Sequence, residues 1–171
     1  MLDLVSPSVA STKLSRWCGL GGGSEVRSAH QISEEGASSP AVSKWGRTMA
    51  DVGKTNIVVM WTVGPDDVAE GDRIFDSHVD WMTGHPRDGD TALLSYRISK
   101  GPELSNPVDP NSDPTGNTVF VLNEVYETPA GVPEHWKQAI ESWQDLPAFM
   151  DWSAKVKVGT LHSGTVVQGL W

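Results

Sequence analysis

The stretch TNIVVMWTV, from Thr55 to Val63, decides the fold because it holds the longest apolar run of the chain. A β-branched and apolar run of this length, followed by turn residues, predicts a buried β-strand. Both faces of the strand are apolar, so it needs cover on both sides. One face would carry Ile57, Val59, Trp61 and Val63, and the other Val58 and Met60.

The segments after this strand alternate between helical and extended patterns. Helices are expected over 66–82 and from Pro133 to about 149–153, and strands over 91–99, 118–127 and within 155–167, with a long loop at 101–117. The order β-α-β-β-α-β is that of the ferredoxin-like α+β fold, a four-stranded antiparallel sheet with two helices on one face. A second copy could cover the bare face by packing sheet on sheet. We therefore predict a homodimer with a cavity between its sheets.

Composition divides the chain into two parts. Residues 1–48 contain ten Ser and six Gly and show no persistent apolar period. Such a segment buries too little apolar surface to offset the entropy lost on ordering. We expect a disordered tail over 1–48 and one folded domain over 49–171. One hypothesis is that Met49 is the true start of the protein.

Charge, hydropathy and cysteine content exclude several classes of partner. The net charge is −9, and an acidic surface neutralises nucleic-acid phosphates poorly. No apolar run approaches the roughly 20 residues that cross a bilayer. Cys18 is the only cysteine, so an internal disulfide is excluded, which fits a reducing, cytoplasmic location. We expect neither nucleic acid nor a membrane as a partner.

The segment from Asn123 to Trp136, NEVYETPAGVPEHW, resembles the third strand and second-helix start of dimeric α+β barrel proteins. More narrowly, it is similar to the antibiotic biosynthesis monooxygenase-like group. The positions that match are Glu124, Tyr126, Ala130 and His135. The loop at 101–117 is longer than in that family, and two prolines interrupt the link before the helix. The resemblance implies an open-ended cavity and, among several activities, cofactor-independent oxygenation of aromatic polyketides or quinols.

Histidines are the candidate acid–base residues because imidazole titrates near neutral pH. We predict two catalytic histidines: His135, at the start of the second helix, and His78, on the apolar stripe of the first. Either would take a phenolic proton and leave an electron-rich anion that reacts with oxygen. Each could instead be a packed core residue that is hydrogen-bonded to its neighbours.

A planar, mostly apolar ligand would be bound by aromatic walls and a few polar groups. The residues predicted to bind it are Asn56, Trp61, Tyr126, Trp136 and His85. We expect no cofactor and no metal; the alternative is a site where histidines converge with Asp76 or Asp80. Two functions stay open: a monooxygenase-like enzyme, and a non-catalytic ligand-binding or assembly protein of the same fold.

Overall fold

The computed structural model describes residues 51–170, so the predicted tail over 1–48 lies outside the described residues. None of the described helices has the length and apolar character that crossing a bilayer requires. The elements are, in chain order, β1 (Thr55–Val63), the short 3-10 helix η1 (Pro65–Asp67), α2 (Val68–Met82), β2 (Leu93–Leu104), β3 (Pro114–Tyr126), α3 (Gly131–Ser142), α4 (Leu146–Ser153) and β4 (Lys157–Thr165).

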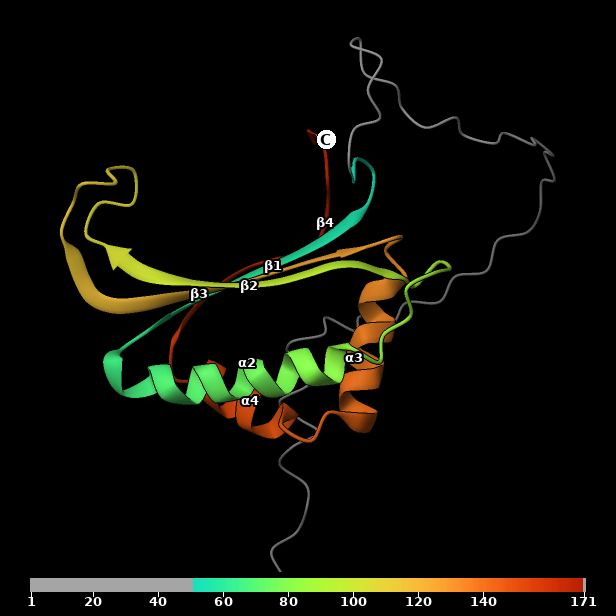
Figure 1. The fold of residues 1–171 in the computed structure, drawn as a ribbon, viewed down its shortest axis with the longest axis horizontal. Coiled ribbons are helices and arrows are strands. Elements are labelled where there is room, and N and C mark those ends of the chain that lie inside the picture. Colours follow the sequence, from blue (N-terminus) through green and yellow to red (C-terminus); the bar gives the residue numbers. More distant parts are fainter. Residues whose placement is uncertain (1–50, 171) are drawn as a thin grey trace, which may run out of the picture. The chain divides into compact units, whose positions relative to one another are not determined.

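The four strands form one open sheet in the order β2-β3-β1-β4, and each neighbouring pair is antiparallel. The helices α2, α3 and α4 lie on the same side of this sheet (Figure 1). The predicted α+β class is therefore confirmed, and the arrangement is compatible with a ferredoxin-like fold. Over residues 51–170 there are three α-helices where the sequence predicted two.

The extra helix arises because the predicted second helix breaks at Trp143. That residue is extended, with φ −82° and ψ 107°. Pro147 lies in the first turn of α4, where its missing N–H costs nothing, whereas inside a continuous helix it would lose a hydrogen bond and clash with the preceding turn. The chain therefore stops α3 and restarts as α4.

The core lies between the helices and the sheet. On β1 the residues with odd numbers are buried, and Trp61 is 0% exposed. The residues with even numbers face the other way, and Met60 is 46% exposed. The predicted division of β1 into two apolar faces is thus confirmed. No described element covers the face that carries Met60. Apolar side chains continue across it, because Met60 pairs with Val121 of β3 and Val58 pairs with Leu161 of β4.

The hairpin of β2 and β3 extends further than the sequence predicted. The two strands pair as far as Leu104 and Pro114, so the link between them is 105–113 and not 101–117. A register shift between Leu93 and Ser95 interrupts the other end of the pairing. After the shift, Tyr96 faces the helices and not the open side of the sheet, which brings its hydroxyl under α2.

Candidate functional site

His78 projects from α2 toward the sheet. It lies among the buried residues of that helix, which include Ile74 and Met82, and only 4% of it is exposed. Its Nδ1 is 2.9 Å from the hydroxyl oxygen of Tyr96 on β2. Its ring centroid is 4.6 Å from that of Trp143. The position that the sequence placed on an apolar stripe is therefore an interior, hydrogen-bonded histidine.

His135 enters the same interior from the first turns of α3. It is buried, and its Nδ1 lies 3.3 Å from Nε2 of His85. His85 follows α2 and is itself buried; its backbone N–H donates to the carbonyl of Met82. Two of the predicted histidines thus touch each other, although 50 residues separate them in the chain.

Glu124 meets the histidines from the sheet. It lies on β3 and is 0% exposed. The hydroxyl of Tyr126, two residues later on the same face, donates to Oε2 of Glu124 at 2.8 Å. The other carboxylate oxygen, Oε1, is buried and has no hydrogen-bond partner within the described part of the chain. A buried polar atom without a hydrogen-bond partner destabilises the folded state. Oε1 is therefore an atom to which a bound ligand could supply the missing partner.

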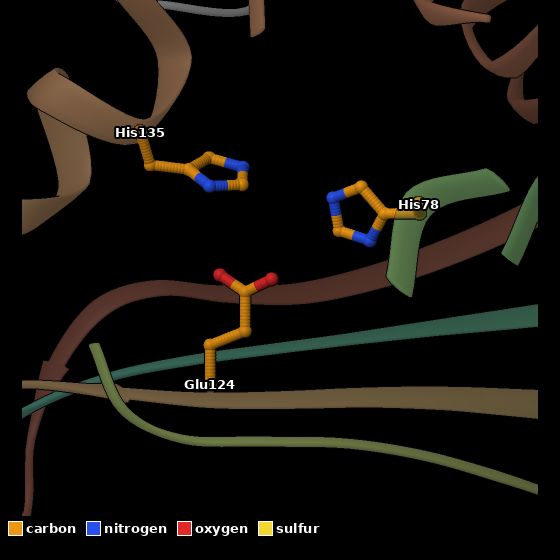
Figure 2. A group of neighbouring side chains, drawn as sticks. All are labelled: His78, Glu124 and His135. Carbon is orange, nitrogen blue, oxygen red and sulfur yellow. The ribbon is translucent and has the colours of Figure 1, made fainter. Parts of the chain in front are cut away.

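His78, Glu124 and His135 converge, and we call these three residues the buried centre. Each offers one nitrogen or oxygen atom, and these atoms lie within 4.8 Å of one another. Figure 2 shows both imidazole rings and the carboxylate directed toward a shared space. Because Nδ1 of each histidine is already engaged, the Nε2 atoms are the ones left for that space.

Burial sets the protonation of the buried centre. Desolvation lowers the pKa of His78 to about 3, and it lowers the pKa of His135 well below its usual value. Desolvation also raises the pKa of Glu124 to about 7, although the hydrogen bond from Tyr126 acts in the opposite direction. Both histidines are consequently neutral at pH 7 and can offer a lone pair from a ring nitrogen.

Aromatic rings enclose the buried centre on the helix side. The rings of Trp81 and Trp143 lie 5.7 Å apart and are inclined by only 18°. Trp81 is also within 5.3 Å of His135, measured between ring centroids. The indole N–H groups are tied to serines, that of Trp81 to Ser142 and that of Trp143 to Ser77. These bonds fix the rings in place.

A groove of about 550 Å³ lies beside the buried centre, between α2 and β2. Tyr96 forms part of its wall and also contacts His78. An ion pair from Lys100 to Asp72, at 2.6 Å, crosses from β2 to α2 at this groove. The other apolar residues that line it are Phe75, Val79, Ile98 and Phe120.

The remaining predicted ligand residues lie elsewhere. Asn56 is on the opposite phase of β1 from Ile57, and its amide donates to Asn123 and to the backbone of Glu124. Trp61 is a core residue whose indole N–H donates to Ser153. Trp136 borders His135, but its N–H donates to His162 on β4 at 2.8 Å. The predicted cavity between two sheets is not where the histidines lie, because they are buried between the sheet and the helices of one chain.

Sequence reasoning left Glu124 and Tyr96 out of the predicted site. A period of two could have found Glu124, because it alternates with Leu122 and Tyr126, which are buried on the same face. A charged residue in the buried phase of a strand is rare enough to indicate a site. No sequence pattern indicates Tyr96 as a site residue, because the face on which it lies depends on the register shift after Leu93.

Comparison of the chain with protein-family models and with curated proteins gives no match. The site is therefore interpreted from its own geometry.

Proposed function

We propose that this chain is a small-molecule-binding enzyme of the dimeric α+β barrel type, with its reaction at the buried centre. The observation that carries the proposal is the convergence of His78, Glu124 and His135 within 4.8 Å in an interior walled by tryptophans. Aromatic walls favour planar, mostly apolar ligands. Polar groups that point into such a space fix the orientation of the ligand and exchange protons with it.

The reaction proposed is monooxygenase-like and acts on a phenol or quinol. A group of the buried centre takes the phenolic proton, which leaves an electron-rich anion that reacts with O₂. One oxygen atom enters the product and the other leaves as water, so a phenol and O₂ give a quinone and water without an added reductant. The sequence predicted a histidine as the base, and Glu124 is a further proton acceptor at the same place.

Access to the buried centre is proposed to lead through the groove between α2 and β2. Tyr96 is the residue that joins the two, because it lines the groove and its hydroxyl contacts His78. A rotation of this one side chain would open a path from the groove to the buried centre. The substrate would then stack against the aromatic residues that line both spaces.

The dimer is part of the proposal and is supported by the open sheet face. Met60 and Leu161 are 46% and 54% exposed, and they belong to strands that pair directly. Adjacent exposed apolar side chains on a sheet are the surface that sheet-on-sheet packing requires. A cytoplasmic location is proposed with it, because the chain has a single cysteine.

The same open face also supports a second function, a non-catalytic binding or assembly protein. In that case the histidines are internal hydrogen-bonding residues, as the contacts of His78 with Tyr96 and of His135 with His85 allow. The unpartnered Oε1 of Glu124 favours the enzyme, because a purely structural core has no use for it.

Oxygen uptake with a panel of phenols and hydroquinones tests the enzyme. We expect Glu124→Gln, His78→Gln and His135→Gln each to lower the rate at least about 100-fold, as loss of an essential proton-transfer group does. The matched control is His162→Gln, which removes a histidine outside the buried centre. Equal rates in all four variants would remove the buried centre as the site of the reaction, and no oxygen uptake by the unaltered chain would assign it to the non-catalytic alternative.

A further inference from the structure

We propose that Nε2 of His78, Nε2 of His135 and Oε1 of Glu124 bind one divalent first-row transition-metal ion. This inference rests on the proposed function, because both concern the buried centre. It adds a metal ion to the three side chains. Two imidazoles and one carboxylate are a donor set that proteins use for such ions, with positions left open for other ligands.

The three donors come from three different elements and meet at one place. They are supplied by α2, by the first turns of α3, and by β3. Their mutual separations of at most 4.8 Å are close to the limit of about 4.2 Å for two ligands of one ion at about 2.1 Å each. A small rotation of the side chains therefore closes the set around an ion (Figure 2).

Each proposed ligand is held from behind by a second residue. Tyr96 contacts Nδ1 of His78, His85 contacts Nδ1 of His135, and Tyr126 donates to Oε2 of Glu124. In each case the hydrogen-bonded atom is a different atom from the proposed ligand atom. Metal-binding histidines almost always have such a partner on the second nitrogen, because it fixes the tautomer and the ring orientation.

These partners also assign the tautomers. If Nδ1–H of His78 donates to the oxygen of Tyr96, its Nε2 carries a lone pair. If Nδ1–H of His135 donates to Nε2 of His85, the same holds for His135. The two Nε2 atoms then face each other across the space above Glu124 in the view of Figure 2.

The charge of the buried centre calls for a cation. Glu124 is fully buried, and a buried carboxylate without a counter-charge is strongly disfavoured. The ion pairs found in the described part of the chain all involve other carboxylates: Glu127, Glu70, Asp145, Asp72 and Glu134. A divalent ion would supply the missing positive charge and the missing partner of Oε1 together.

An ion at this place also suits the proposed substrate. Three protein ligands leave coordination positions free, and a phenolic oxygen is a suitable ligand for one of them. Binding to a divalent ion lowers the pKa of a coordinated hydroxyl group. The ion would thus promote the loss of the phenolic proton that the proposed function requires. With the ion bound, this proton would pass to water and not to one of the three ligands, because the ion occupies their lone pairs.

The test is metal binding to the full chain after treatment with a chelator, with Zn²⁺ and Co²⁺ as separate probes in competition with a chromophoric chelating dye. We expect one ion per chain. Glu124→Gln and His78→Gln should weaken binding at least about 100-fold, and Tyr96→Phe by about 10- to 100-fold through loss of its support of His78. His162→Gln, the matched control, should bind as the unaltered chain does.

X-ray absorption of the Zn²⁺-loaded, unaltered chain keeps the test valid even if a variant fails to fold. Two imidazole ligands and oxygen donors are expected. Absence of stoichiometric binding, or equal affinity in Glu124→Gln and His162→Gln, would overturn the metal site. Oxygen uptake by the metal-free chain, together with the absence of stoichiometric binding, would overturn the metal site and leave the enzyme. Stoichiometric metal binding at the buried centre without uptake of oxygen would overturn the proposed enzyme and leave the metal site.

Discussion

The hydroxyl of Tyr126 donates to Oε2 of Glu124 at 2.8 Å, and Oε1 of the same carboxylate is buried without a partner. One oxygen of the group is thus anchored to its own strand, while the carboxylate as a whole lies beneath the rings of His78 and His135 (Figure 2). This asymmetry distinguishes the buried centre from a packed polar core, in which both oxygens would be bonded.

Replacement of Glu124 should change how stability depends on pH in the metal-free protein. Its pKa is about 7 when folded and 4.5 for the exposed group, so between these values the folded state holds the proton more tightly. The free energy of unfolding therefore falls as pH rises from about 4.5 to about 7. Glutamine does not titrate, so Glu124→Gln should not show this fall. The free energy of unfolding of the variant minus that of the unaltered chain should therefore rise by roughly 3 kcal/mol from pH 4.5 to pH 8.

Urea unfolding in the presence of a chelator measures this difference. Glu103→Gln is the control, because hydrogen bonds from Asn117 and Thr115 lower the pKa of Glu103, which is the opposite direction to Glu124. A constant difference between Glu124→Gln and the unaltered chain at both pH values would contradict the assignment of Glu124 as a buried, titrating carboxyl.

Alkaline titration should show that both tyrosines resist ionisation. The chain has only two, Tyr96 and Tyr126, and burial raises the pKa of each above its usual value of 10. We expect no tyrosinate absorbance near 295 nm at pH 11 in the folded protein, and two tyrosinates per chain in denaturant. Since the unfolded chain loses these protons first, stability should fall as pH rises above about 10. A midpoint near 10 in the folded protein would show that the phenols are solvated.

A charge on the open sheet face should dissociate the proposed dimer. Met60→Glu and Leu161→Glu each place a carboxylate among apolar side chains of β1 and β4, where burial against a second sheet would be strongly unfavourable. Light scattering coupled to gel filtration is expected to give a dimer for the unaltered chain and a monomer for both variants. Val108→Glu is the control, because Val108 is 87% exposed in the β2–β3 link. A monomeric unaltered chain would remove the dimer from the proposed function.

Loss of the Ser77 hydroxyl should loosen Trp143. The Oγ of Ser77 accepts from the indole N–H of Trp143 at 3.1 Å and donates to Asp145 at 2.6 Å. Ser77→Ala leaves both groups without this partner, and we expect a loss of about 1–3 kcal/mol in the free energy of unfolding. Urea unfolding measures the loss, and Ser99→Ala on the exposed part of β2 should change it by less than about 0.5 kcal/mol. An equal effect of the two substitutions would show that the Ser77 contacts are not stabilising.

The limits of sequence reasoning are physical. The bounds of β1 could be predicted in full, because an apolar run between turns has one favourable conformation, and its alternation follows from the geometry of a strand. The break after Ser142 does not follow from the apolar pattern, which continues from the second predicted helix through Pro147. Here the backbone requirement of proline outweighed the pattern.

The candidate site could be predicted only in pieces. The sequence placed His78 on an apolar helix face and His135 at a helix start, and both positions are confirmed. Their convergence with Glu124 depends on how α2 and α3 pack over β3. The hydrophobic periodicity of a single segment gives no information on that packing. The contact between His135 and His85 has the same origin, because it joins two segments 50 residues apart.

The three-residue turn at 143–145 has a consequence for how this protein can vary. Trp143 begins the turn and packs on His78, and Asp145 ends it and bonds Ser77 and Arg73. An insertion or deletion of one residue here would shift both anchors relative to α2 at the same time. The β2–β3 link, which is far from His78 along the sheet, can change its length freely. Tolerance to changes in length should therefore be high at one end of the molecule and almost nil at the other.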